Sequence, residues 1–157
     1  MKKALINLTF IITGLLFYGT SYSNNVDSIL NSEQAPTGVV FEIVSGKPGI
    51  LNKLLPSIKL DIDRLRNRYP KLPIAIVSHG REQFDLTSKN SSKYAVAHNM
   101  AKSLVKTNEV NLHICETHAG WYDINAEDFP DYVDVAPAGP VQINDYEELG
   151  YELIVLP

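Results

Sequence analysis

One short segment, NLHICETHAGW, holds the only cysteine of the chain, Cys115, together with two histidines. His113 lies two residues before the cysteine, His118 lies three residues after it, and Glu116 follows it directly. The nucleophilic form of cysteine is the thiolate, which a helix N-terminus or a cationic side chain favours and a nearby carboxylate opposes. The segment therefore predicts a reactive thiol, and the alternative is a buried, inert one that packs like a small apolar side chain.

A second candidate segment, PIAIVSHG, places a histidine and a glycine at the end of an apolar run. The candidate catalytic residues are therefore Cys115, His118 and His79. The candidate binding residues around them are His113, Glu116, Trp121 and Gly80. Three of them have a structural alternative: His113 can be a core histidine, His79 can turn the chain, and Trp121 can be a packing residue.

The spacing H-x-C-x-x-H also offers a metal-binding alternative, with His113, Cys115 and His118 as ligands and His79 as a fourth. Sulfur combined with imidazole suits copper or zinc. The pattern lacks paired CxxC motifs and HExxH, and the chain has no phosphate-binding glycine loop and no G-x-S-x-G elbow. We therefore expect neither a metal nor a cofactor, and the second hypothesis is a small-ligand or metal-binding module whose pocket the cysteine only lines.

The elements that must position these residues alternate between apolar strands and amphipathic helices. An alternation of this kind predicts an α/β fold, here a three-layer α/β/α domain with a mostly parallel five-stranded sheet. In such sheets, ligands gather beyond the carboxyl ends of the strands, where Cys115 and His79 both lie. The predicted strands are 38–45, 73–80, 109–115, 132–139 and 151–156, and the predicted helices are 55–68, 92–107, 116–121 and 141–150.

The N-terminus predicts export. Two lysines precede an apolar run, and Ser21-Tyr22-Ser23 has the small-x-small form of a cleavage site, so residues 1–23 are typical of a secretory signal peptide. The alternative is an uncleaved anchor, but the run is shorter than the ~20 residues of a spanning helix. We expect residues 24–37 to be a flexible lead-in, 38–157 to form the domain, and the protein to be periplasmic, with no membrane contact after cleavage.

The charge of the chain bears on its partners. Cleavage after residue 23 would remove two of the 14 basic residues and none of the 18 acidic ones, which lowers the net charge from −4 to −6. An acidic protein of this kind argues against nucleic acid as a partner.

Four segments, taken in order, resemble the DsrE/DsrF-like family: VFEIVSG, IAIVSHGREQFDL, VNLHICETHAGW and VDVAPAGPVQINDYEELGYELI. The resemblance covers residues 38–157 and implies a compact α/β/α domain that forms small homo-oligomers, often trimers or hexamers. In the sulfur-relay members of the family, the cysteine after the third strand carries sulfur as a persulfide, and that position is Cys115. The resemblance thus implies a sulfur or thiol carrier, with a sulfur-donor or acceptor protein as partner. Export departs from the relay members, which work in the cytoplasm.

Overall fold

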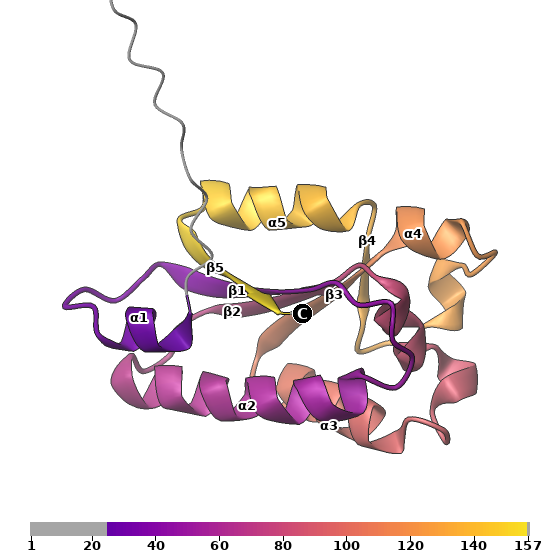
Figure 1. Ribbon diagram of the computed structural model, residues 1–157, viewed down its shortest axis with the longest axis horizontal. Coiled ribbons are helices and arrows are strands. Elements are labelled where there is room, and N and C mark those ends of the chain that lie inside the picture. Colours follow the sequence, from indigo (N-terminus) through magenta and orange to yellow (C-terminus); the bar gives the residue numbers. More distant parts are fainter. Residues whose placement is uncertain (1–24, 157) are drawn as a thin grey trace, which may run out of the picture.

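The computed structural model describes residues 25–156 of the chain, and its five strands form one sheet in the order β4-β3-β2-β1-β5 (Figure 1). All four neighbouring pairs of strands are parallel, which confirms the predicted α/β class. The strands are β1 Gly38–Ile43, β2 Ile74–Ser78, β3 Val110–Cys115, β4 Asp134–Ala136 and β5 Tyr151–Leu156.

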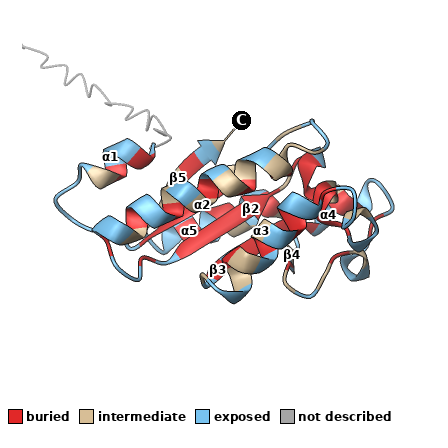
Figure 2. Ribbon diagram, turned by 90° about the horizontal axis from the view of Figure 1, so that it is seen from below, coloured by how far each residue is buried: buried red, intermediate tan, exposed pale blue. Residues whose placement is uncertain are grey.

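Helices cover both faces of the sheet, as predicted. Figure 1 shows α5 on one side and α2 and α3 on the other, and Figure 2 shows the buried strands beneath the inner sides of α2 and α3. The helices are α1 Val26–Leu30, α2 Leu51–Arg68, α3 Ala95–Lys106, α4 Glu116–Gly120 and α5 Gly139–Glu148, and the 3₁₀ helices are η1 Arg81–Leu86, η2 Ser88–Asn90 and η3 Ala126–Asp128. Among residues 25–156, no helix has both the length and the apolar composition to cross a membrane.

Strand alternation divides the core into two parts. On β1, Phe41 and Ile43 belong to the larger cluster under α2 and α3, whereas Val40 belongs to a smaller one with Ile143 and Tyr146 of α5. Successive side chains of a strand point to opposite faces, so a strand covered on both sides must be apolar almost throughout. Strand β1 follows this rule except at Glu42, which is only partly buried on the α5 face.

Part of the predicted flexible lead-in is helical. Residues 26–30 form α1, and Val26 and Ile29 of this helix are buried in the larger core cluster. Tyr69, just after α2, donates its hydroxyl to the carbonyl oxygens of Ile29 and Ser32 at 3.0 and 2.8 Å. A five-residue helix is too short to show periodicity in a polar sequence, so only these tertiary contacts reveal it.

Helix α2 begins four residues before the predicted start, with Pro56 inside it rather than in its first turn. A distant carboxylate supports this first turn, because Asp85 of η1 accepts the N–H groups of Gly49 (2.8 Å) and Leu51 (3.4 Å). Asp85 thus performs the role of an N-cap across 34 residues. Burial raises the pKa of Asp85, while its bonds to Gly49 and Leu51 act in the opposite direction.

Two other predictions concern the fourth strand and the N-terminal segment of the chain. Of the predicted strand 132–139, only Asp134–Ala136 is a strand, and Gly139 already belongs to α5. The predicted signal peptide, residues 1–23, lies outside the described residues.

Candidate functional site

A pocket of about 360 Å³ opens at the carboxyl ends of β1, β2 and β3, on the face that α5 covers. Its lining is largely apolar and contains five of the residues singled out in the sequence. The lining residues are Val44, His79, Gly80, Cys115, Thr117, His118, Trp121, Ala138 and Pro140. The predicted edge of the sheet is therefore hollowed at the cysteine.

Cys115 ends β3 and is the N-cap residue of α4, with 4% of its surface exposed. Its sulfur accepts the backbone N–H of His118 at 3.4 Å, and its own N–H donates to Oε1 of Gln83 at 2.8 Å. The thiol is thus fixed in place by the first turn of a helix and reaches solvent only at the pocket.

His118 has one ring nitrogen engaged. Its Nδ1–H donates to the carbonyl oxygen of His79 at 2.6 Å, which leaves Nε2 as the nitrogen without a partner among the described residues. The rings of Phe84, Trp121 and Tyr122 surround it at centroid distances of 5.7, 5.3 and 5.5 Å. The imidazole is therefore held in one orientation at the pocket wall.

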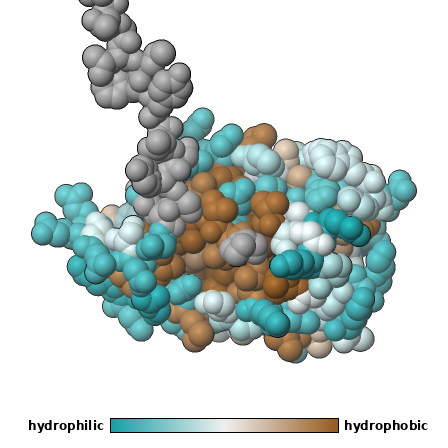
Figure 3. Space-filling model, in the orientation of Figure 1, coloured by the Kyte–Doolittle hydropathy of each residue, from teal (hydrophilic) through white to brown (hydrophobic). Residues whose placement is uncertain are grey.

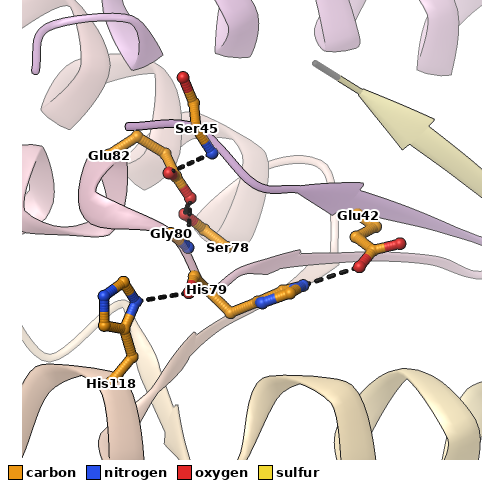
Figure 4. A network of polar contacts seen from close by, with 7 residues as sticks. All are labelled: Glu42, Ser45, Ser78, His79, Gly80, Glu82 and His118. Carbon is orange, nitrogen blue, oxygen red and sulfur yellow. Dashed lines mark hydrogen bonds and ion pairs between the residues drawn. The ribbon is translucent and has the colours of Figure 1, made fainter. Parts of the chain in front are cut away.

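His79 points the other way. Figure 4 shows the His79 ring turned toward Glu42 of β1, while His118 faces the carbonyl of the same residue. His79 Nε2 and Glu42 Oε1 are 2.8 Å apart, and the two side chains are 15% and 20% exposed. Gly139 at the start of α5 packs on the base of this histidine, because a Cβ at Gly139 would lie 2.5 Å from Cβ of His79. The sheet and α5 together fix the imidazole.

A buried carboxylate supports the loop ends around the pocket. Glu82 is fully buried and accepts bonds from the N–H of Ser45 (2.7 Å), the hydroxyl of Ser78 (2.7 Å) and the N–H of Gly80 (2.9 Å), as Figure 4 shows. Gly80 leaves room for this arrangement, since a Cβ there would lie 2.6 Å from the backbone of Ser45. Glu82 therefore joins the ends of β1 and β2.

The other predicted residues are not all part of the pocket. Trp121 stands at its mouth with 74% of its surface exposed, and Glu116 is exposed on α4 outside the lining. His113 shares the α5 face with Cys115 but bonds the hydroxyl of Tyr146 at 2.8 Å, away from the pocket. No three His, Cys, Asp or Glu side chains in residues 25–156 gather as metal ligands would, so the alternative ligand set of His113, Cys115, His118 and His79 does not come together in this structure.

Sequence reasoning missed four residues that build the site: Glu42, Glu82, Gln83 and Asp85. Their signals were present, since Glu42 interrupts an apolar strand and the others follow Gly80 at the carboxyl edge of the sheet. Gln83 is fully buried beside the backbone of Cys115, and its Nε2 has no partner among the described residues. From sequence alone, a polar segment after a strand is interpreted as a solvent-exposed loop, because the sequence does not show that its side chains are buried.

His113 gives a prediction for the pH dependence of stability. Burial lowers the pKa of His113, and the charge of Asp134 acts in the opposite direction. An unfolded chain binds a proton at this position below about pH 6.5, whereas the folded protein resists it, so the free energy of unfolding should fall as the pH drops through that window. Urea denaturation at pH 7.5 and 5.5 should show a smaller fall for His113→Gln than for the wild type. Equal falls would contradict this role.

Comparison with known proteins supports the fold. No protein-family model matches the chain, and no curated protein sequence matches it. The structure resembles that of MTH1491, a protein of unknown function from Methanobacterium thermoautotrophicum, with a TM-score of 0.57 and 18% identity over 75% of this chain and 97% of that one. It also resembles the ychN protein of E. coli, with a TM-score of 0.57 and 17% identity over 76% of this chain and 99% of that one. Both neighbours belong to the DsrE/DsrF-like fold family.

Proposed function

We propose that this protein carries sulfur on Cys115, receiving it from a persulfide donor and passing it to an acceptor thiol. The observation that carries the proposal is the position of Cys115, which is held as the N-cap of α4 and lines a pocket with His79 and His118 at the carboxyl edge of the sheet. The resemblance of residues 38–157 to the DsrE/DsrF-like family, whose sulfur-relay members carry sulfur at the position of Cys115, also supports this role.

The proposed reaction needs no external oxidant. The Cys115 thiolate attacks the outer sulfur of a persulfide, R–S–S–H; the S–S bond of the donor breaks, and R–S⁻ leaves and takes up a proton. Cys115 then holds the sulfur as a persulfide, which an acceptor thiolate removes by the same exchange in a second step. The sulfur already has its oxidation state in the donor, so each step only moves it from one thiol to another.

Intact-mass spectrometry tests the proposal. The protein, purified without reductant and incubated with a low-molecular-weight persulfide, is expected to gain the mass of one sulfur atom, about 32 Da. An acceptor thiol should remove this mass. Protein alkylated at Cys115 beforehand is the control and should gain nothing. Wild-type protein that takes up no sulfur, although its thiol alkylates readily, would overturn the proposal.

The apolar lining of the pocket favours a second function, a small-ligand module in which Cys115 is only a wall residue. Pockets of a few hundred Å³ with few polar groups are typical ligand sites. In this case a ligand would protect Cys115 from alkylation without any covalent change in mass. The mass measurement above therefore separates the two functions.

Export is part of the proposal. The mature protein is expected to begin near Asn24, since a basic start, a short apolar run and Ser21-Tyr22-Ser23 are typical of a cleaved signal peptide. N-terminal sequencing of the protein from the periplasmic fraction checks this. Recovery of a chain that still begins at Met1, in the membrane fraction, would indicate an anchor instead.

Assembly into homo-oligomers is the last part of the proposal. Figure 3 shows apolar surface across the β5 side of the sheet, and Val155 of this strand has 44% of its surface exposed. Apolar surface of this kind often marks an interface between copies of a chain. We expect the mature protein to elute as a trimer or hexamer in light-scattering chromatography. A mass equal to one chain at micromolar concentration would count against it.

A further inference from the structure

We propose that Glu42 is a positioning residue for His79 and that the Glu42–His79 pair exchanges the proton that moves when sulfur is transferred at Cys115. This inference rests on the proposed function and assigns the proton transfer to one of the two histidines at the pocket. Three observations lead to it: the register of the sheet, the burial of the pair and the partners of the two imidazoles.

The register of the sheet brings His79 and Cys115 to the same edge. Ser78 of β2 pairs with Ile114 of β3 in the last pair of this ladder, and His79 and Cys115 are the residues that follow. The backbone of His79 still follows β1, because its N–H donates to the carbonyl oxygen of Ile43 at 3.1 Å. Both side chains lie on the α5 face and line the same pocket. Glu42, His79 and Cys115 thus come from three adjacent strands, in the order carboxylate, imidazole and thiol.

Among residues 25–156, the polar contact that the Glu42 carboxylate makes is with His79. It interrupts an apolar strand, and its partner among the described hydrogen bonds is Nε2 of His79 at 2.8 Å. A carboxylate of this kind keeps the imidazole proton on Nε2, which leaves Nδ1 as the nitrogen that takes up or releases a proton. It also compensates the positive charge that the ring gains when Nδ1 is protonated.

His118 is less suited to this task. Its Nδ1 donates to the carbonyl oxygen of His79, no carboxylate within residues 25–156 bonds it, and three aromatic rings pack around it. Its backbone N–H, and not its ring, bonds the sulfur. We therefore assign His118 to positioning the thiol and the pocket wall.

The proton path balances when Cys115 takes up the sulfur. The thiol of Cys115 gives its proton to Nδ1 of His79, and the thiolate attacks the outer sulfur of the persulfide. The leaving R–S⁻ takes that proton from Nδ1, which returns the imidazole to its neutral form. No hydrogen bond joins the sulfur to the His79 ring in this structure, so the proton transfer requires the two groups to approach each other when a substrate is bound, as catalytic groups commonly do.

The pH profile of iodoacetamide labelling of Cys115 tests the inference. The titratable groups near His79 among the described residues are Glu42 from β1, Cys115 from β3 and His118 from α4. The residue of α5 that packs on His79 is Gly139, which has no titratable side chain. Glu42→Gln keeps the shape of the side chain but removes the negative charge that holds the proton on Nε2 of His79 and compensates a protonated imidazole. We expect it to label about tenfold more slowly at pH 7, with the profile moved to higher pH, and His79→Ala to label more slowly still.

Glu116→Gln is the matched control, because it removes the same charge from an exposed side chain next to Cys115 in the sequence. Loss of a negative charge alone favours the thiolate, so this variant should label no more slowly than the wild type. Opposite effects of the two Glu→Gln changes therefore support the pair. Equal effects, or an unchanged profile in Glu42→Gln, would overturn the inference.

A second measurement guards against misfolding. Free imidazole added to His79→Ala should restore part of the labelling rate and should have no effect on the wild type, which a purely structural histidine would not explain.

Sulfur uptake distinguishes the two proposals. If the wild type and Glu42→Gln take up sulfur at the same rate and with the same pH dependence, Glu42 has no role in the transfer, but the carrier function of Cys115 stands. A shifted labelling profile without sulfur uptake would remove the carrier function and leave the pair as a thiol-activating device.

Discussion

Replacing Glu82 by alanine is expected to lower the free energy of unfolding by about 3 kcal/mol or more. The Glu82 carboxylate is fully buried and accepts two backbone N–H groups and one hydroxyl from the ends of β1 and β2. Its removal leaves the buried donors of Ser78 and Gly80 and the partly buried N–H of Ser45 without this acceptor, and each buried group costs about 1–3 kcal/mol. Urea denaturation of the mature protein, followed by circular dichroism, measures the change.

Two further variants make the Glu82 result specific. Glu82→Gln keeps the volume and one acceptor oxygen, so it should lie between alanine and the wild type. Glu116→Ala removes an exposed carboxylate near the same edge and should stay within about 0.5 kcal/mol of the wild type. If Glu82→Ala and Glu116→Ala have the same stability, Glu82 does not hold the strand ends together.

Replacing Cys115 by serine is expected to abolish sulfur uptake completely while leaving the fold intact. Serine has nearly the shape of cysteine and can accept the His118 N–H that now bonds the sulfur at 3.4 Å. Stability should therefore change by no more than about 1 kcal/mol. Intact-mass spectrometry after incubation with a persulfide measures the uptake, and the circular dichroism spectrum and the elution volume check the fold.

The folded and unfolded states of the wild type provide the companion measurement. Cys115 is only 4% exposed but lines an open pocket, so iodoacetamide should reach it in the folded protein. We expect the folded thiol to react faster than the unfolded one at pH 7, because the N–H of His118 and the neighbouring histidine favour the thiolate. A folded thiol that reacts more slowly at every pH would be an inert core residue, and the carrier function would be wrong.

The fold could be predicted from the sequence because its signals are local. The apolar runs that became β1, β2 and β3 must be buried on both faces, and the helices between them allow only parallel neighbours. The same signals placed Cys115 and His79 at the carboxyl edge, where the pocket lies. The short helix α1 could not be predicted, because five residues are too few to show a helical period.

What the sequence by itself determined is therefore the class of the fold, the order of its elements and the edge at which the thiol and His79 meet. Only the tertiary structure decided which polar side chains are buried and what they contact. Glu42 reaches His79 across 37 positions of the chain, Glu82 binds Ser45 across the same separation, and His113 bonds Tyr146 across 33. A hydrogen bond between strands or from a loop to a strand depends on distances that no local pattern encodes, because the partner is set by the register of the sheet and the packing of α5 on it.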